Sequence, residues 1–140
     1  MTDKIRLLGI YLFAADVSAS ASFYEAIGLD IERISQDFVR ATWGDTVMLE
    51  IGSSVLTLSY DPQFETPDHL SKSTINFSLD SEAAVDELFT AMVDEGYIGH
   101  LAPCLAPWQA RFAIIEDPDG NFVGLHSPRD VDADRGRERQ

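Results

Sequence analysis

Side chains able to bind a metal or act as nucleophiles are few and scattered in this 140-residue chain. The histidines are His69, His100 and His126, and the single cysteine is Cys104. Their spacing matches no metal-ligand motif, because such motifs repeat His or Cys at short, fixed intervals. A cysteine nucleophile needs a neighbouring base, and Cys104 lies in a proline-flanked segment without one. From these residues we expect neither a catalytic group nor a histidine-based metal centre.

Motifs of other enzyme classes are missing as well. The sequence contains no Gly-x-Ser-x-Gly, no Walker sequence and no His-Glu-x-x-His. Glu50 is the carboxylate of most interest, since it either faces a cavity or lies solvated on the outside of a strand.

The same inventory bears on location. One cysteine excludes an internal disulfide and is typical of a reducing cytoplasm. No apolar run approaches the roughly 18 residues of a membrane span. The N-terminus lacks the pattern of a signal peptide. We therefore expect a cytoplasmic protein.

The clearest local structure is a hairpin between Arg111 and Pro128, where two apolar runs flank Asp117-Pro118-Asp119-Gly120-Asn121. Pro118 suits the second position of a turn because its φ is fixed and it has no N–H. Gly120 and Asn121 tolerate the positive φ of a tight turn. The side chain of Asp117 can accept a hydrogen bond from the backbone two residues on.

These residues are positioned by secondary-structure elements that follow the same order twice along the chain. In the first copy we expect a strand at 5–14, a helix from the cap Asp16 (or Ser18) to Gly28, and strands at 29–35, 47–51 and 55–60. In the second we expect a strand at 73–79, a helix capped by Asp80 or Ser81 and ended by Gly96, and strands at 97–101, 109–116 and 122–126. Residues 37–44 fit neither pattern clearly, and 102–107 are expected to form a loop.

The sequence therefore predicts an α+β fold of two βαβββ modules, 5–60 and 73–127, in one domain spanning 1–128. Residues 61–72 form the linker. Residues 129–140 lack apolar periodicity, so we expect a disordered tail.

This order resembles the vicinal oxygen chelate superfamily, which includes glyoxalase I, extradiol dioxygenases, fosfomycin-resistance enzymes and bleomycin-binding proteins. Asp16, a helix containing Phe23-Tyr24, and then Gly28-Leu29 are similar to the family's opening pattern. Pro107-Trp108 and the turn at 117–121 resemble its closing pattern. The resemblance covers all but the tail. It implies that the modules form a curved mixed β-sheet cup around one cavity.

The resemblance also locates the metal positions of the superfamily's metal-dependent members. They map to Gly9, Thr57, Thr74 and Gly124, with Gly52 taken as the hairpin glycine that matches Gly120. Glycine has no ligand atom, and a threonine hydroxyl is weak beside imidazole or carboxylate. We therefore expect no metal and no other cofactor. Glycine at two of these positions is expected to leave room for a bulky ligand.

Residues sharing a strand face with the mapped positions are expected to line the cavity, because strand side chains alternate with period two. Trp43 and Trp108 are added because each precedes the last hairpin of its copy, where a loop can close the cavity. The expected ligand-binding residues are Tyr11, Phe13, Trp43, Thr57, Thr74, Asn76, Trp108, Phe112, Ile114, Phe122 and His126. Aromatic residues with a few polar groups suit a small-molecule cavity. The alternative is that the aromatics pack the core and that His126 is a hydrogen-bonded structural residue.

Net charge bears on the partners. The chain carries −14, and its last twelve residues hold four Arg and four acids, so the excess lies before residue 129. Such a body repels nucleic acid and anionic membranes and attracts cations, although an ordinary solvated surface is also acidic in many proteins.

We therefore expect a metal-independent homodimer that binds an aromatic small molecule, as the resemblance to bleomycin-resistance proteins implies. If the acidic charge of the protein serves ligand binding, the ligand is a cation. The alternative within the superfamily is a lyase, isomerase or dioxygenase with an atypical metal site or none. A third reading is an interaction module with a vestigial cavity.

Overall fold

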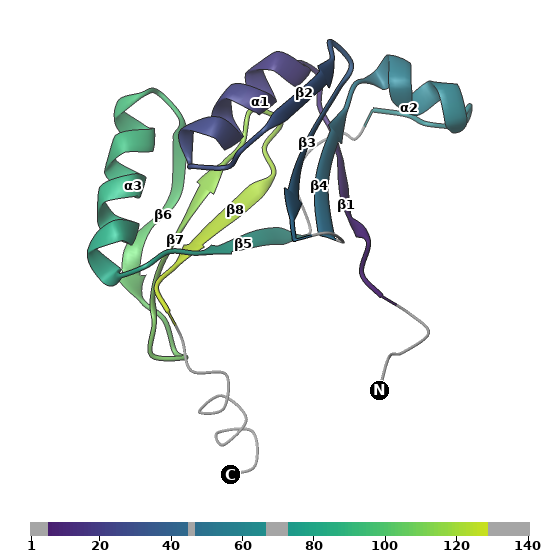
Figure 1. Ribbon diagram of the computed structural model, residues 1–140. Helices are drawn as coiled ribbons and strands as arrows, with labels where there is room; N and C mark the ends of the chain where they lie inside the picture. Colours follow the sequence, from purple (N-terminus) through teal and green to yellow (C-terminus); the bar gives the residue numbers. More distant parts are fainter. Residues whose placement is uncertain (1–5, 45–46, 67–72, 129–140) are drawn as a thin grey trace. The chain divides into compact units, whose positions relative to one another are not determined.

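The computed structural model describes residues 6–44, 47–66 and 73–128. The chain divides between His69 and Leu70 into two compact units, unit 1 and unit 2. Each unit contains one four-stranded mixed sheet and repeats the order strand, helix, strand, strand, strand (Figure 1). The α+β class and the two βαβββ modules predicted from the sequence are thus confirmed. The predicted tail and most of the predicted linker, 67–72, lie outside the described residues.

Unit 1 is built on a sheet whose first strand pairs with its last. The strand order is β1 (Gly9–Phe13), β4 (Val47–Gly52), β3 (Phe38–Trp43) and β2 (Glu32–Ser35). β1 runs parallel to β4, and the other neighbours are antiparallel. The segment 37–44, which the sequence left open, is therefore the strand β3 and its turn.

Helix α1 (Val17–Ala26) covers one face of this sheet. Asp16 caps it by accepting a hydrogen bond from the Ala19 backbone N–H at 3.0 Å, as predicted. Gly28 follows the helix with φ 113°, a conformation that favours glycine. The buried core on this side comprises Val17, Ala21, Phe23, Tyr24, Val39, Ala41, Leu49 and Ile51. Each large apolar side chain buried here contributes about 1.5–3 kcal/mol relative to exposure.

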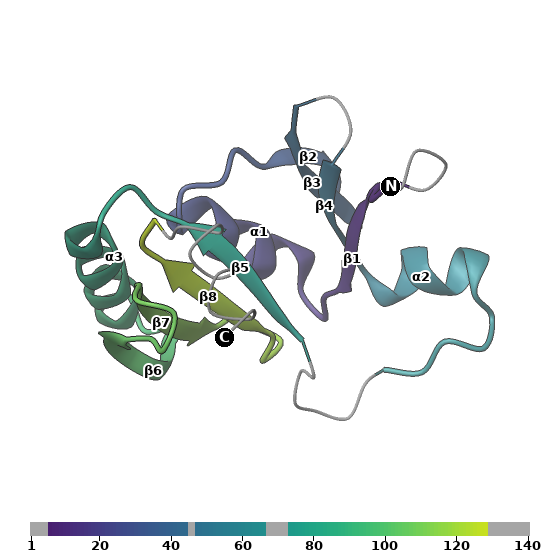
Figure 2. The ribbon, with the colours of Figure 1, turned by 90° about the horizontal axis from the view of Figure 1, so that it is seen from below.

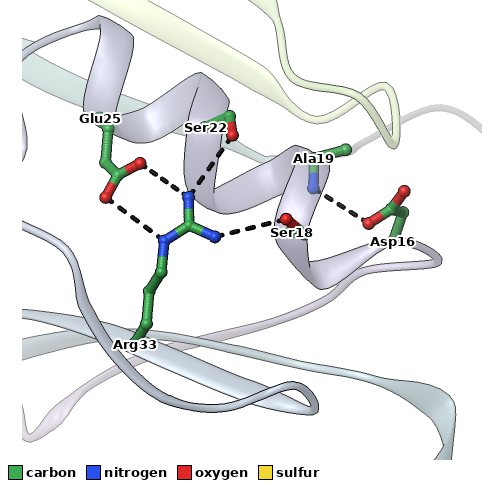
Figure 3. Close-up of polar contacts among 6 residues, drawn as sticks. All are labelled: Asp16, Ser18, Ala19, Ser22, Glu25 and Arg33. Carbon is green, nitrogen blue, oxygen red and sulfur yellow. Dashed lines mark hydrogen bonds and ion pairs between the residues drawn. The ribbon is translucent and has the colours of Figure 1, made fainter.

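Arg33 of β2 forms hydrogen bonds and an ion pair with polar side chains on one side of α1 (Figure 3). Its Nη2 lies 2.8 Å from Glu25 Oε1, and its Nη1 and Nη2 donate to the hydroxyls of Ser18 and Ser22 at 3.3 and 3.4 Å. These three residues share one side of the helix because they are spaced by four and three. The Arg33 hydrogen bond holds the pKa of Glu25 below its ordinary value.

The predicted strand at 55–60 is wrong. These residues form helix α2 (Ser54–Tyr60), which lies at the β1 side of the sheet (Figures 1 and 2). Ser53 caps the helix by accepting a hydrogen bond from the Leu56 backbone N–H at 3.1 Å. The cap favours a helix despite the β-branched Val55 and Thr57, whose intrinsic preference is for strands.

Unit 2 repeats the topology with the order β5 (Thr74–Ser78), β8 (Phe122–His126), β7 (Arg111–Glu116) and β6 (Ile98–Leu105). Helix α3 (Glu82–Asp94), capped by Ser81, packs on β6, β7 and β8. The buried residues on this side are Val85, Met92, Ala113, Ile115, Val123 and Leu125. β6 extends through most of the predicted loop at 102–107, with register shifts after Gly99 and Leu101 that absorb its extra residues.

The hairpin of β7 and β8 is confirmed. Asp117 Oδ1 accepts hydrogen bonds from the backbone N–H groups of Asp119 and Asn121, each at 2.9 Å, and Gly120 has φ 84°. Among the described residues, no helix is long and apolar enough to cross a membrane.

Candidate functional site

Each sheet has a face turned away from its helix, here called the far face. In unit 2 the strand register aligns its side chains in rows across β5, β8 and β7, because directly opposed residues lie on the same face. The rows are Thr74–Phe122–Glu116, Asn76–Gly124–Ile114 and Ser78–His126–Phe112. The structure thus brings together all the predicted site residues of this half that lie on strands. Whether they bind a ligand stays a prediction.

A hydrogen bond between Asn76 and His126 lies at the centre of this face. His126 Nε2 is 2.7 Å from Asn76 Oδ1. A carbonyl oxygen only accepts, so the Nε2 atom of the ring carries the proton in this arrangement. His126 is buried, whereas Asn76 is exposed. The amide group of Asn76 therefore connects a buried ring to the surface.

Gly124 makes this hydrogen bond possible. A Cβ atom at position 124 would lie 2.1 Å from Asn76 Oδ1 and 2.9 Å from His126 Nε2. At Gly9, a Cβ would lie 2.2 Å from the backbone oxygen of Met48 on the neighbouring strand. The expectation that these glycines leave room for a ligand is therefore wrong, because the space is filled by the protein itself.

The rings of Trp108, Phe112 and His126 form a cluster on this face, here called the ring cluster, in which Phe112 and His126 are stacked and Trp108 is tilted against both, by 52° and 32°. Phe112 and His126, opposite each other on β7 and β8, have ring centroids 5.4 Å apart and planes 21° apart. The Trp108 ring lies 5.1 Å from Phe112 and 6.0 Å from His126. Trp108 precedes β7 in a tight loop in which Ala106 N–H donates to Ala110 O at 2.7 Å. Trp108 and Phe112 are half-buried, so each is partly accessible to solvent.

Trp43 does not match Trp108. It ends β3, inside the last hairpin of unit 1, and is 44% exposed, whereas Trp108 comes before the last hairpin of unit 2. The prediction that the two tryptophans occupy equivalent places is wrong.

The far face of unit 1 carries two of the remaining predicted residues, whereas Thr57 lies on α2 and Trp43 shares its strand face with the buried Val39 and Ala41. Tyr11 and Phe13 lie there on β1, and Tyr11 hydroxyl is 2.9 Å from Thr57 Oγ1 on α2. Thr57 uses its own proton on Ser53 O at 2.8 Å, so Tyr11 is the donor. Burial is the main reason that the pKa of Tyr11 is raised above its ordinary value of 10.0. Thr57 thus anchors α2 to the sheet through its side chain.

Thr57 is not the counterpart of Gly124, because it lies on a helix. The parallel strand pairs give the correct match: Gly9 pairs with Met48 and Thr74 with Phe122, so the third pairs are Tyr11–Glu50 and Asn76–Gly124. Glu50 therefore takes the place in unit 1 that Gly124 takes in unit 2.

A hollow of about 370 Å³ also lies on unit 1, lined by Asp30, Glu32, Arg40 and Thr42. Arg40 Nε is 3.0 Å from Glu32 Oε1 within it. None of the predicted site residues lines this hollow.

Comparison with known proteins identifies the family. The family model of the Glyoxalase/Bleomycin resistance protein/Dioxygenase superfamily matches residues 6–125. The chain belongs to this superfamily. No curated protein matches it.

Several solved structures have the same fold as this chain. A glyoxalase-related enzyme from Fulvimarina pelagi has a TM-score of 0.76 and 19% identity, covering 88% of each chain. A glyoxalase/bleomycin resistance protein/dioxygenase family enzyme from Burkholderia phytofirmans PsJN has a TM-score of 0.75 and 22% identity, covering 88% of this chain and 98% of its own. Lactoylglutathione lyase from Agrobacterium tumefaciens has a TM-score of 0.66 and 22% identity, and the match covers 91% of this chain and 96% of the lyase chain.

The residues at the superfamily's metal positions do not fit a metal. With the corrected match, the set is Gly9, Glu50, Thr74 and Gly124, which offers one carboxylate and one weak hydroxyl. Within 6–44, 47–66 and 73–128, no three His, Cys, Asp or Glu side chains gather as a metal site. The donor set therefore gives no support for a metal-dependent step.

Sequence reasoning missed the role of α2 and with it two aromatic residues. Tyr60 lies 6.1 Å from Tyr11, and Phe64, just after the helix, lies 5.1 Å from Phe13, centroid to centroid. The cap signal at Ser53 was the available clue, since Ser followed by a mixed apolar segment starts helices as well as turns.

Proposed function

We propose that this chain is a metal-independent small-molecule-binding protein, and that the far face of unit 2 holds a planar aromatic ligand. The observation that carries the proposal is the ring cluster beside Asn76, in which Trp108 and Phe112 are half-buried and His126 is buried. These rings lie on the face away from α3, so they are not part of the helix-covered core of unit 2.

The chemistry of the ring cluster suits a flat ligand with a polar edge. Offset stacking on an aromatic ring adds about 0.5–1.5 kcal/mol beyond the area buried. The amide of Asn76, whose oxygen accepts from His126, still has two N–H donors for a ligand acceptor. A few polar groups among aromatic side chains are typical of small-molecule sites.

A cationic ligand is favoured over an anionic one by charge. The chain carries −14, so its field raises the local concentration of cations. This long-range contribution should weaken as salt is added, while the stacking contact should persist. Drug sequestration, as in bleomycin resistance, is the corresponding biological role within the superfamily.

The test is a titration with planar aromatic cations, such as acridine dyes, followed by calorimetry and by tryptophan fluorescence at low and high salt. Trp108→Ala should weaken binding by about tenfold, from the loss of roughly 1.4 kcal/mol of stacking and burial. Trp43→Ala is the matched control and should leave affinity unchanged, because Trp43 is not part of the ring cluster of unit 2.

Two outcomes would count against the proposal. One is equal affinity of wild type and Trp108→Ala. The other is about one Zn, Fe, Mn or Ni per chain retained after dialysis, with binding lost on chelation, which would favour the enzyme alternative instead. Equal binding of anionic analogues would remove the cation preference alone.

We also propose a homodimer. The strand β1 is an edge of its sheet, and Leu8 before it and Ile10 within it are 66% and 43% exposed. An apolar edge strand offers unpaired backbone groups to a second chain. Light scattering at micromolar concentration should give twice the chain mass of 15.5 kDa, and a monomer would contradict the proposal.

A further inference from the structure

We infer that Tyr11, Tyr60 and Glu50 in unit 1 form a binding site for an organic ammonium group. The two tyrosine rings meet at right angles, with centroids 6.1 Å apart and an angle of 88° between their planes. Glu50 lies directly opposite Tyr11 on the neighbouring strand β4, and its negative charge adds to burial, the main cause of the raised pKa of Tyr11.

Perpendicular aromatic rings create a corner that suits a rounded, weakly hydrated cation. The face of an aromatic ring is negative, and a cation within about 6 Å of its centroid is attracted to it. A cation placed in the corner reaches both rings at once. Methylated ammonium groups match such corners because their methyl groups contact the rings while their charge is retained.

The first ring of the corner, Tyr11, is held in place by neighbouring groups. Tyr11 donates to Thr57 Oγ1, which in turn donates to Ser53 O, so the first ring is fixed to the start of α2. Gly52 lies under the phenol, where a Cβ atom would come within 1.9 Å of Tyr11 Oη. The second ring, Tyr60, is 62% exposed at the end of α2 and is open to a ligand.

Charges along the same row favour a cation. Strand register aligns Glu32, Arg40, Glu50 and Tyr11 across the sheet. Arg40 Nε forms an ion pair with Glu32 Oε1 at 3.0 Å, and this pair lies at the end of the row opposite to Tyr11. Two carboxylates against one guanidinium leave the row negative, and Glu50 is the carboxylate next to the ring.

An inorganic cation suits the corner less well. One carboxylate and two phenols are too few oxygens for calcium or magnesium, which take six or more ligands. The site also shares no residue with the one proposed for unit 2, because all its residues belong to unit 1. Either proposal can fail without the other.

The experiment compares choline with 3,3-dimethylbutan-1-ol, which has the same shape without the charge. Both are titrated into the full chain while the ring signals of Tyr11 and Tyr60 are followed by NMR, with sodium chloride used to match ionic strength. We expect saturable shifts with choline and at least about tenfold weaker binding of the neutral analogue.

Variants assign the effect to the corner. Tyr60→Leu and Glu50→Gln should each weaken choline binding by about three- to tenfold, whereas Tyr60→Phe should keep it within about twofold because the ring face remains. Val55→Ala, at an exposed position of the same helix, is the matched control and should change nothing. Trp108→Ala should also leave choline binding intact.

The inference is overturned by any of three results: equal binding of the neutral analogue, full binding by Tyr60→Leu, or no saturable shift with choline. Circular dichroism of each variant is the check that its secondary structure is retained. Because Tyr60 is largely exposed, its replacement is compatible with folding.

Discussion

Replacing Gly124 by alanine tests the central arrangement of unit 2. The added methyl group would lie 2.1 Å from Asn76 Oδ1 and 2.9 Å from His126 Nε2, so the Asn76 side chain must swing away and its bond to His126 must break. The Asn76 side chain is exposed and can move, so the main cost falls on buried His126.

The magnitude follows from that bond. A hydrogen bond contributes about 0.5–1.5 kcal/mol net, and a buried polar group that loses its partner costs about 1–3 kcal/mol. We therefore expect Gly124→Ala to lower the free energy of unfolding by about 2 kcal/mol, measured by urea denaturation. Thr74→Ala, exposed on the same face, is the control and should change it by less than about 0.5 kcal/mol.

A double-mutant cycle separates this cause from general crowding. In an Asn76→Ala background the hydrogen bond is already absent, so adding Gly124→Ala should cost about 1 kcal/mol less than it does in wild type. Additive costs, or a neutral Gly124→Ala variant, would refute the reasoning.

Three further predictions concern single contacts. Because Arg33 lowers the pKa of Glu25, their interaction stabilises the folded chain above the ordinary carboxyl pKa, and this stabilisation is lost as pH falls through the pKa of Glu25 in the folded chain. An NMR titration should give Glu25 a pKa below that of an ordinary Glu, and Arg33→Met should return this pKa to the ordinary value. The pKa of Tyr11 is raised, so the Tyr11 hydroxyl contributes to the free energy of unfolding below pH 10.0, and this contribution declines as pH rises above 10.0. In urea denaturation, Tyr11→Phe should reduce the loss of stability at alkaline pH. The same dependence of stability on pH in the variant and in wild type would contradict the prediction. Asp117→Ala removes a buried carboxylate that accepts three hydrogen bonds from Asp119 and Asn121, and should cost about 2–4 kcal/mol in the same assay, with Asp117→Asn costing less.

The parts of the fold that were predictable are those fixed by local chemistry. Asp117, Pro118 and Gly120 specify the last turn through their own backbone preferences, and Asp16 and Ser81 specify helix starts through their side-chain oxygens. The alternation of apolar residues then places the far face of unit 2 correctly, because period two needs only the strand boundaries.

The errors came from segments whose state depends on distant contacts. Val55 to Tyr60 contains strand-favouring residues, and the Ser53 cap and the hydrogen bond that Tyr11 donates to Thr57 stabilise this segment as a helix. Taking Gly52 as a hairpin glycine then shifted the match between modules, so that Glu50 was overlooked at the position equivalent to Gly124. Which atoms fill the space beside a glycine also depends on the neighbouring strand, which the sequence does not reveal.

The parallel pairing of the first and last strands of each module has a consequence for synthesis. Gly9 finds its partner only once Met48 has left the ribosome, and Thr74 only once Phe122 has. Until then β1 and β5 lack the neighbour that completes their sheet, and such long-range pairing is slow. Unit 1 can complete its sheet while unit 2 is still being made, so a stalled or truncated chain that ends within β4 or β8 would expose an apolar edge to aggregation.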